Sequence, residues 1–389
     1  MSRRMEADLR LKRPKLLAFN SALNNTKQEA SAQILRSNGR NYCRPPDLLE
    51  DRKQELPLDS YSDIRFVEAV KAFTTYPLFD LQDTTTSLLL CSIPDHPIRL
   101  HSALSSELIA SYPFVNTTTE AYIAPHSLLF TGHGRNFIAG SSNLVATFDV
   151  TRPGHGPSSL FVTAASRRSR KLNGSIGLRG IVSALSIDPA SKVLAAGTFS
   201  RHVGLYDAAG EGESLGVFKL EGNEADGRIS GRGITQLIWS PCGRYLYIVE
   251  RQSHGIMVYD IRKSGQLLSW TEGRMAETNQ RLQVDLFNSP NASGDLELWA
   301  GGVDGNIRVW RNTHCQEGGQ QPDLDWHLHD DAVSSTTVHP SGTVVASCSG
   351  QRHFKMDQQD SSDSDERSDD GTDVVIKKTF DNSLKLWTI

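Results

Sequence analysis

The chain has 389 residues, of which 38% are hydrophobic and 22% charged, with 31 glycines and a formal net charge of −4. Its longest apolar run, Ser87–Ile93, is far too short to cross a bilayer, and the basic N-terminus lacks the apolar core of a secretory signal. The five cysteines are widely spaced, without a C-x-x-C pair. This spacing argues against a zinc site or a disulfide framework and predicts a reduced, intracellular protein.

Residues 1–60 form the first predicted unit, a basic and irregular segment. They contain Pro45-Pro46 and show no clean alternation of apolar and polar residues, so we expect mostly irregular or disordered chain there. Residues 61–389 are predicted to form a WD-repeat β-propeller, interrupted by a disordered acidic insertion at 355–375. Within that insertion, residues 357–373 hold eight acidic residues and one arginine, a composition that cannot bury apolar surface.

The propeller is predicted from a spacing that occurs six times. A short polar turn is followed, six residues later, by the last core residue of a β-strand. This degenerate WD pattern indicates an all-β propeller with six discernible repeats. The pairs are Asp95 and His101, Ser142 and Phe148, Ser200 and Tyr206, Ser253 and Tyr259, Asp304 and Trp310, and Asp381 and Trp387.

The individual strands of a repeat are also legible. Residues Ile234–Trp239 and Val333–Val338 have the alternation and β-branched content of first strands, and Tyr245–Val249 has that of a second strand. Extra length between repeats should lie in loops, where insertions cost little. One such stretch is the basic sequence RRSRK at 167–171.

The turn aspartates Asp95, Asp304 and Asp381 are interpreted as structural. In WD blades an Asp at this place buries its carboxylate against neighbouring hydroxyl, imidazole or indole groups and so ties strands together. His329 is read in the same way, as the histidine that opens a WD repeat.

Several longer phrases occur in order: PDHPIRLHSALSSELIASY at 94–112, AYIAPHSLLF at 121–130, GITQLIWSPCGRYLYIVE at 233–250 and ETNQRLQVDL at 277–286. This series resembles the telomerase Cajal body WD-repeat proteins, especially their fungal relatives, over roughly residues 76–389. The resemblance implies a seven-bladed propeller whose first repeat precedes a sequence like PPDLLE. Residues 45–50 match that sequence, but residues 1–44 do not look like a WD repeat, so the first blade is expected to be degenerate or missing.

The resemblance further implies a nuclear, non-enzymatic scaffold that binds small Cajal body RNAs and telomerase RNA and directs ribonucleoprotein particles. Thr278 to Arg281 match the family's TNQR. Asn and Gln can pair with base edges, and Arg can bind phosphate or stack on a base. Alternatively, these residues cap a loop and the Arg is merely solvated. The predicted RNA-binding residues are Asn279, Gln280, Arg281, Gln351, Arg352, Arg167, Arg168, Arg170, Lys171 and Arg179.

The basic residues at 167–171 and Arg179 would act on RNA phosphates, or else form a solvated loop. No phosphate-binding loop, H-E-x-x-H or G-x-S-x-G sequence is present, so we expect neither an enzyme nor a cofactor or metal. Lys12-Arg13-Pro14-Lys15 resembles a nuclear localisation signal. The expected partners are Cajal body, telomerase or spliceosomal RNA and ribonucleoprotein proteins. The alternative is a protein-interaction scaffold or splicing accessory factor that binds no guide RNA.

Overall fold

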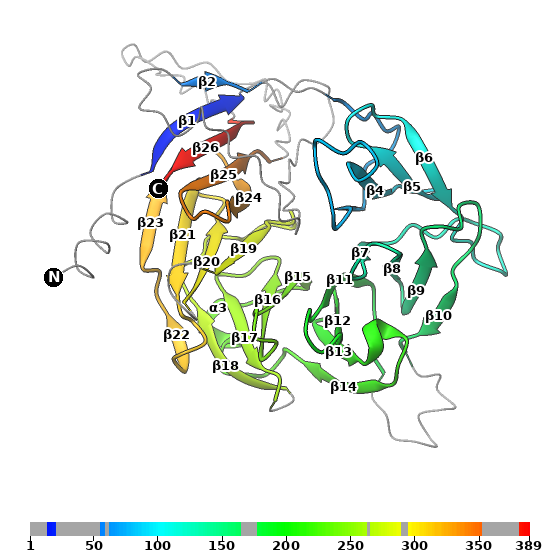
Figure 1. Ribbon diagram of the computed structural model, residues 1–389. Coiled ribbons are helices and arrows are strands. Elements are labelled where there is room, and N and C mark those ends of the chain that lie inside the picture. Colours follow the sequence, from blue (N-terminus) through cyan, green and yellow to red (C-terminus); the bar gives the residue numbers. More distant parts are fainter. Residues whose placement is uncertain are drawn as a thin grey trace, which may run out of the picture.

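The computed structural model describes residues 14–20, 55–58, 62–164, 177–262, 265–288, 295–351 and 381–389. Their regular structure is almost entirely β-strand, in six mainly antiparallel sheets placed like blades around one centre (Figure 1). Two single turns, η2 (Ala208–Gly210) and α3 (Asp226–Ile229), are the helical elements of these residues. Neither is long and apolar enough to span a membrane. The all-β propeller predicted from the sequence is confirmed.

Blades 1 to 3 are four-stranded and follow the chain, so each strand pairs with the next. Blade 1 is β3 (Ala72–Thr75), β4 (Leu88–Ser92), β5 (Ile98–Ser102) and β6 (Leu108–Tyr112); blade 2 is β7 (Ser127–Phe130), β8 (Asn136–Ser141), β9 (Leu144–Asp149) and β10 (Ser159–Val162); blade 3 is β11 (Val182–Ile187), β12 (Leu194–Thr198), β13 (His202–Tyr206) and β14 (Ser214–Lys219).

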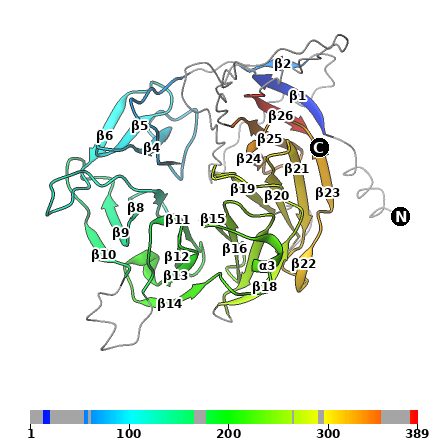
Figure 2. The same cartoon turned by 180° about the vertical axis from the view of Figure 1, so that it is seen from behind.

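Blades 4 and 6 carry strands from elsewhere in the chain on their outer sides, and the connection between the last two strands of blade 5 supplies the one in blade 4. Figure 2, seen from behind, shows the same ring order with these blades on the opposite side. Blade 4 is β15 (Ile234–Trp239), β16 (Tyr245–Glu250), β17 (Ile256–Asp260), β18 (Gln266–Thr271) and β22 (Gly318–Gln320); blade 5 is β19 (Val284–Asn288), β20 (Leu296–Gly301), β21 (Asn306–Arg311) and β23 (Leu324–His327); blade 6 is β24 (Val333–Val338), β25 (Val344–Ser349), β26 (Leu384–Thr388), β1 (Lys15–Asn20) and β2 (Leu56–Pro57).

A glycine at the end of a second strand lets successive blades approach closely. A Cβ on Gly197 would lie 2.7 Å from Ile234, at the start of the next blade's first strand. In blade 5, a Cβ on Gly301 would lie 2.5 Å from Val333. Blades narrow toward the centre, and only a residue without a side chain fits at this distance. This repeated glycine therefore sets the spacing of the inner ring.

The N-terminal part of the chain contributes to blade 6. Lys15–Asn20 pair antiparallel with β26, with Lys15 opposite Thr388 and Asn20 opposite Leu384. The sequence had placed these residues in an irregular segment outside the 61–389 propeller, and the structure instead puts them inside the fold. Pairing with β1 covers the edge of β26, which would otherwise expose unpaired backbone groups.

Apolar side chains fill the junctions between successive blades. Buried clusters join blades 1 and 2, 2 and 3, 3 and 4, 4 and 5, and 5 and 6. None of the buried clusters formed by the described residues joins blade 6 to blade 1. The described part of the chain has six blades where the family resemblance implies seven. Cys91 and Cys348 are buried, and the predicted acidic insertion at 355–375 lies outside the described residues.

Candidate functional site

The six polar turns found in the sequence all connect the second and third strands of a blade. Because the strands of a blade alternate in direction, these turns lie at the same rim as the connections that lead into each next blade. We call this edge rim 1. The sequence Thr278 to Arg281 lies in the connection from β18 to β19, and Arg179 lies in the connection from β10 to β11, so both are on rim 1. Gln351 lies two residues after the end of β25, on the same rim.

An aromatic ring flanked by two guanidinium groups lies near the centre of rim 1. The Cζ atom of Arg251 is 4.5 Å from the centroid of the Phe199 ring, and that of Arg281 is 5.8 Å from it. The His126 ring meets Phe199 edge-on at 6.3 Å. These residues come from blades 2, 3 and 4 and from the connection to blade 5. They meet because these blades are arranged around one centre (Figure 1).

Arg281 reaches across the central opening. Its Nη2 donates to the carbonyl oxygen of His126 at 2.8 Å, which links the entrance of blade 5 to that of blade 2. Its neighbour Gln280 donates from Nε2 to the carbonyl oxygen of Gly350 in blade 6 at 2.9 Å. Asn279 is exposed and accepts from Gln252 Nε2 at 3.0 Å. The TNQR sequence is therefore anchored on both sides and exposes Asn279.

The described residues at the opening carry positive charge. Burial, and then repulsion by Arg251, lowers the pKa of Arg281. Burial, followed by the charges of Lys71 and Arg281, lowers the pKa of His126. Among the described residues, no carboxylate lies within ion-pair distance of Lys71, Arg251 or Arg281. An anion entering here would find cations already in place, and desolvation strengthens their attraction.

A buried ion pair fixes the two turns that carry this cluster. Arg201 donates to both carboxylate oxygens of Glu250, at 2.8 and 2.9 Å, and its Nη1 lies 2.7 Å from Asp226. Arg201 is two residues after Phe199, and Glu250 directly precedes Arg251. The bidentate pair thus holds the aromatic ring and the guanidinium in register.

A second buried arginine supports the connection between β18 and β19. Arg274 is 1% exposed; its Nε donates to the carbonyl oxygen of Gly301 at 3.2 Å, and its Nη2 donates to that of Leu282 at 3.0 Å. Burial lowers its pKa to about 10. By joining the end of β20 to the start of β19, Arg274 positions the segment that includes Asn279 and Arg281.

Asp381 makes the contacts expected of a turn aspartate. Its carboxylate lies 3.1 Å from His329 Nδ1, while Ser347 Oγ lies 2.7 Å from His329 Nε2 and accepts from Trp387 Nε1 at 2.7 Å. Since a carboxylate only accepts, Nδ1 carries the imidazole proton and the serine hydroxyl donates to Nε2. This chain of bonds joins the segment before β24 to β25 and β26.

The other two turn aspartates differ from this arrangement. Asp304 pairs with Arg308, at 2.6 Å between Oδ2 and Nη2, so a guanidinium takes the place of imidazole and hydroxyl. Asp95 is exposed, with a φ of +55° in the β4–β5 turn. We expected a buried carboxylate at Asp95, but the turn leaves this residue exposed to solvent.

Two of the remaining predicted site residues, Gln351 and Arg179, lie among the described residues. Gln351 donates from Nε2 to Asp331 Oδ1 at 2.6 Å and so serves the fold locally. Arg179 is exposed on rim 1, next to Gly180, which bonds to Asn143 of blade 2. Residues Arg167, Arg168, Arg170, Lys171 and Arg352 lie outside the described residues.

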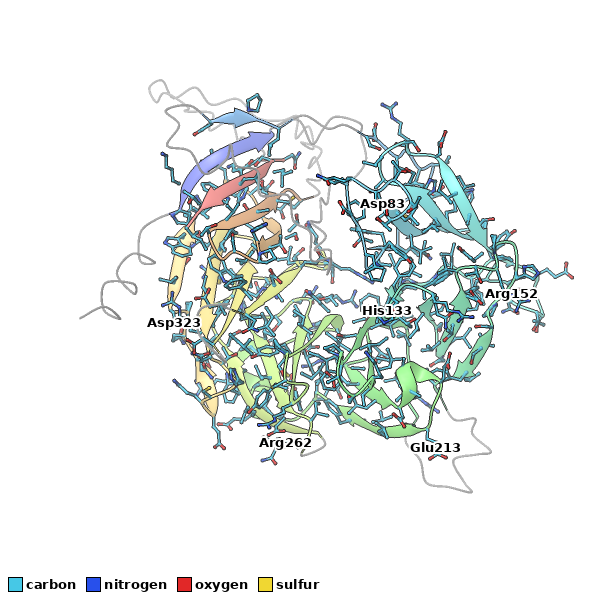
Figure 3. The ribbon with its side chains drawn as sticks, in the orientation of Figure 1. Asp83, His133, Arg152, Glu213, Arg262 and Asp323 are labelled. Carbon is cyan, nitrogen blue, oxygen red and sulfur yellow. The ribbon has the colours of Figure 1, made fainter. Side chains whose placement is uncertain are left out.

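Sequence reasoning missed Phe199, Arg251 and Gln252. Phe199 directly precedes Ser200, and Arg251-Gln252 directly precede Ser253, two of the polar turn residues identified from the spacing. Inspecting the residue before each polar turn would have found them. The side chains drawn in Figure 3 fill the spaces between blades, and the labelled Arg152 lies at the outer margin. Among the described residues, no group of His, Cys, Asp and Glu could hold a metal ion.

No protein-family model matches the chain. Curated proteins do. The chain is 30% identical over 299 residues to the Schizosaccharomyces pombe protein "Guanine nucleotide-binding protein negative regulator 1", covering 76% of this chain and 69% of that protein. It is 29% identical over 316 residues to human "Telomerase Cajal body protein 1", covering 80% of this chain and 53% of the human protein. "Protein SWT21" of Kluyveromyces lactis is 27% identical over 255 residues, covering 64% of this chain and 57% of that protein.

The match to the mammalian proteins is partial in length, since the chain spans about half of each. The fission yeast protein is covered over more than two thirds of its length. Together with the six-bladed propeller, these matches show that the chain belongs to the WD-repeat family of the telomerase Cajal body proteins and the fission yeast regulator.

Proposed function

We propose that this propeller is a non-enzymatic nuclear scaffold that binds small non-coding RNA at the centre of rim 1 and directs ribonucleoprotein localisation or assembly. The RNA would be of the Cajal body, telomerase or spliceosomal kind, and the protein partners those of the same particles. The observation that carries this proposal is the Phe199 ring with Arg251 at 4.5 Å. The name of the human relative refers to telomerase and Cajal bodies, which supports this choice of client.

The chemistry of the cluster suits an unpaired RNA segment. Proteins that bind single strands combine cations along the backbone with aromatic rings on which bases stack. Phe199 supplies the ring, Arg251 and Arg281 supply positive charge beside it, and Lys71 adds positive charge near His126. Asn279 adds an exposed amide beside them. The segment must be unpaired, because a paired base cannot present its face to Phe199.

Binding of labelled single-stranded RNA to the full chain tests this proposal, with fluorescence anisotropy as the readout. Phe199→Ala should weaken binding by about 1–3 kcal/mol, the usual loss for one stacked base. Arg251→Glu should weaken binding strongly and reduce its salt dependence. The matched control is Arg152→Glu, the same charge change at the exposed outer margin (Figure 3).

Equal effects of Arg251→Glu and Arg152→Glu would contradict a site at the opening. Crosslinking in cells followed by sequencing of bound RNA identifies the client. Recovery of box-type guide or telomerase RNA supports the first kind, and recovery of spliceosomal RNA supports a splicing role. No RNA above background would favour a scaffold that binds only proteins.

A protein-interaction scaffold is the second candidate, and one observation favours it. Large exposed apolar side chains lie mainly between Val67 and Val162, the part of the chain that contains blades 1 and 2. On the outer strands, Leu108 and Ile109 of β6 are 53% and 54% exposed, and Leu160 and Val162 of β10 are 52% and 65% exposed. Such a concentration is typical of protein contacts. The fission yeast relative is named for a guanine nucleotide-binding protein, so pull-down of a protein partner without RNA would support this alternative.

A further inference from the structure

The turn between β16 and β17 contains a residue in an unfavourable backbone conformation. Gln252 has a φ of +51°, a region that residues with a side chain rarely adopt. The corresponding turn contains Asp95 in blade 1 and Asn143 in blade 2, also at positive φ. Asp and Asn tolerate this conformation because their short polar side chains can hydrogen-bond to the local backbone, and the longer side chain of Gln lacks this advantage. In blade 3 the residue is Arg201, whose side chain forms the ion pair with Glu250.

The side chain of Gln252 faces the TNQR sequence. Its Nε2 donates to Oδ1 of Asn279 at 3.0 Å, and its backbone nitrogen donates to the carbonyl oxygen of Thr278 at 3.1 Å. The backbone bond holds the two loops together, and the side-chain bond joins the two amides. A glycine at this position would keep the backbone bond without strain. The glutamine therefore contributes something that its backbone alone does not.

The bond between the two amides leaves part of their hydrogen-bonding capacity for a ligand. Each side-chain amide has an acceptor oxygen and an NH₂ group. The bond uses Gln252 Nε2 and Asn279 Oδ1, so the Gln252 Oε1 acceptor and the Asn279 Nδ2 donors remain to bind a ligand. Turning both amides over exchanges the donor and acceptor roles but again leaves one of each. An adjacent acceptor and donor is the pattern with which amides bind adenine, at its amino group and a ring nitrogen.

The position of this amide edge connects it to the stacking site. Gln252 directly follows Arg251, and Asn279 lies two residues before Arg281, the two residues whose guanidinium groups flank Phe199. We propose that Gln252 and Asn279 together read the edge of one unpaired adenine, and so are specificity-determining residues of the RNA site. This inference rests on the proposed function. Phe199 and Arg251 would supply affinity, and the amide pair would supply selectivity.

Selection from a pool of RNA hairpins with a randomised single-stranded loop tests this inference on the full chain. Wild-type protein should enrich adenine at one loop position by about 5- to 150-fold, the discrimination of one bidentate contact. Gln252→Gly removes the amide but suits the positive φ, so it should lose the adenine preference without lowering the melting temperature. Asn279→Ala should also lose the preference, and Gln252→Asn, which keeps an amide, should retain part of it.

The outcomes separate this inference from the function on which it rests. If wild-type protein binds no RNA from the pool, the proposed function is wrong. If it binds RNA without preferring adenine at any position, only the assignment of Gln252 and Asn279 is wrong. Retention of an adenine preference by both Gln252→Gly and Asn279→Ala would likewise overturn the assignment. Loss of the preference in both variants, with affinity still sensitive to Phe199→Ala, is the expected result.

Discussion

Replacing Arg201 by alanine would leave the Glu250 carboxylate buried without its partner. The Glu250 side chain is 2% exposed, and Arg201 supplies two of its hydrogen bonds, at 2.8 and 2.9 Å. The donor that would remain is the backbone nitrogen of Gly233, at 3.2 Å. Burial already raises the pKa of Glu250, and the hydrogen bonds and charge of Arg201 partly offset that rise. In Arg201→Ala, the free-energy cost of burying this carboxylate is therefore no longer offset by the arginine.

The size of that cost depends on pH, because the carboxyl can escape ionisation by binding a proton. Taking up a proton at pH 7 by a group with an unfolded pKa of about 4.3 costs at most about 3.7 kcal/mol. At pH 5 the same limit is about 1 kcal/mol. Since the folded pKa is raised, the penalty is absent below the unfolded pKa and grows as pH rises toward the folded pKa. Asp226 adds little, because its side chain is 28% exposed and solvent screens it.

Urea unfolding followed by tryptophan fluorescence measures this cost. Arg201→Ala should lower the free energy of unfolding by up to about 3.7 kcal/mol at pH 7, since protonation of Glu250 limits the loss, and by much less at pH 5. In the Arg201→Ala background, Glu250→Gln should remove the difference between the two pH values, because an amide does not ionise. A loss of the same size at pH 5 and pH 7 would refute the reasoning.

Two further predictions concern blade 6. Asp381→Asn should lower the free energy of unfolding by about 2–3 kcal/mol at pH 7, because bonds to a charged group are lost. Burial raises the pKa of Asp381, but hydrogen bonds from His329, Ser383 and Lys385 outweigh this effect and lower the pKa. The stability that these bonds give is present above about pH 3.9 and is lost as the pH falls. The melting temperatures of the variant and the wild type should therefore converge in acid. Removing residues 1–20 deletes β1 and should lower the melting temperature and cause aggregation through the edge of β26, whereas removing residues 1–13 should not; equal melting temperatures for the two truncations would contradict a structural role for β1.

The repeats could be found in the sequence because their signal is local. The polar turn and the strand end of a blade lie six residues apart, so Asp381 and Trp387 mark blade 6 without any knowledge of the ring. The strand β1 gave no such signal. Its partner β26 lies at the opposite end of the chain, and the six residues of β1 carry no turn of the repeat. A strand that completes a distant sheet is specified by the edge it covers, not by its own pattern.

The site was predicted only where one stretch of sequence carries it. The resemblance identified Asn279 and Arg281, and both lie on rim 1. Phe199 and Arg251 belong to different blades and meet only because the blades are neighbours in the ring. Their sequences, FSRH and ERQSH, have no composition that indicates stacking. The charge at the opening likewise depends on the folded arrangement, because the sequence near Arg251 does not show whether a carboxylate from another blade lies beside it.

Arg281 contacts the fold and belongs to the proposed RNA site, and its replacement by methionine separates the contribution to stability from the contribution to binding. The guanidinium is desolvated, and no described carboxylate pairs with it, so its lowered pKa reflects a cost to the folded protein. Against this cost stands one hydrogen bond to His126, at 2.8 Å, which is worth about 1.5–3 kcal/mol when the donor is charged. Methionine keeps an apolar side chain near Phe199 and removes both the cost of desolvating the guanidinium and the hydrogen bond to His126.

Arg281→Met should therefore change the free energy of unfolding by no more than about 1 kcal/mol, since buried charges are often replaced by apolar residues without loss. RNA binding should weaken, and its dependence on the logarithm of salt concentration should fall by about 0.7, the contribution of one phosphate contact on a single strand. Urea unfolding and anisotropy titrations at several salt concentrations measure the two effects. A strongly destabilised variant with unchanged salt dependence would mean that Arg281 stabilises the fold and makes no phosphate contact.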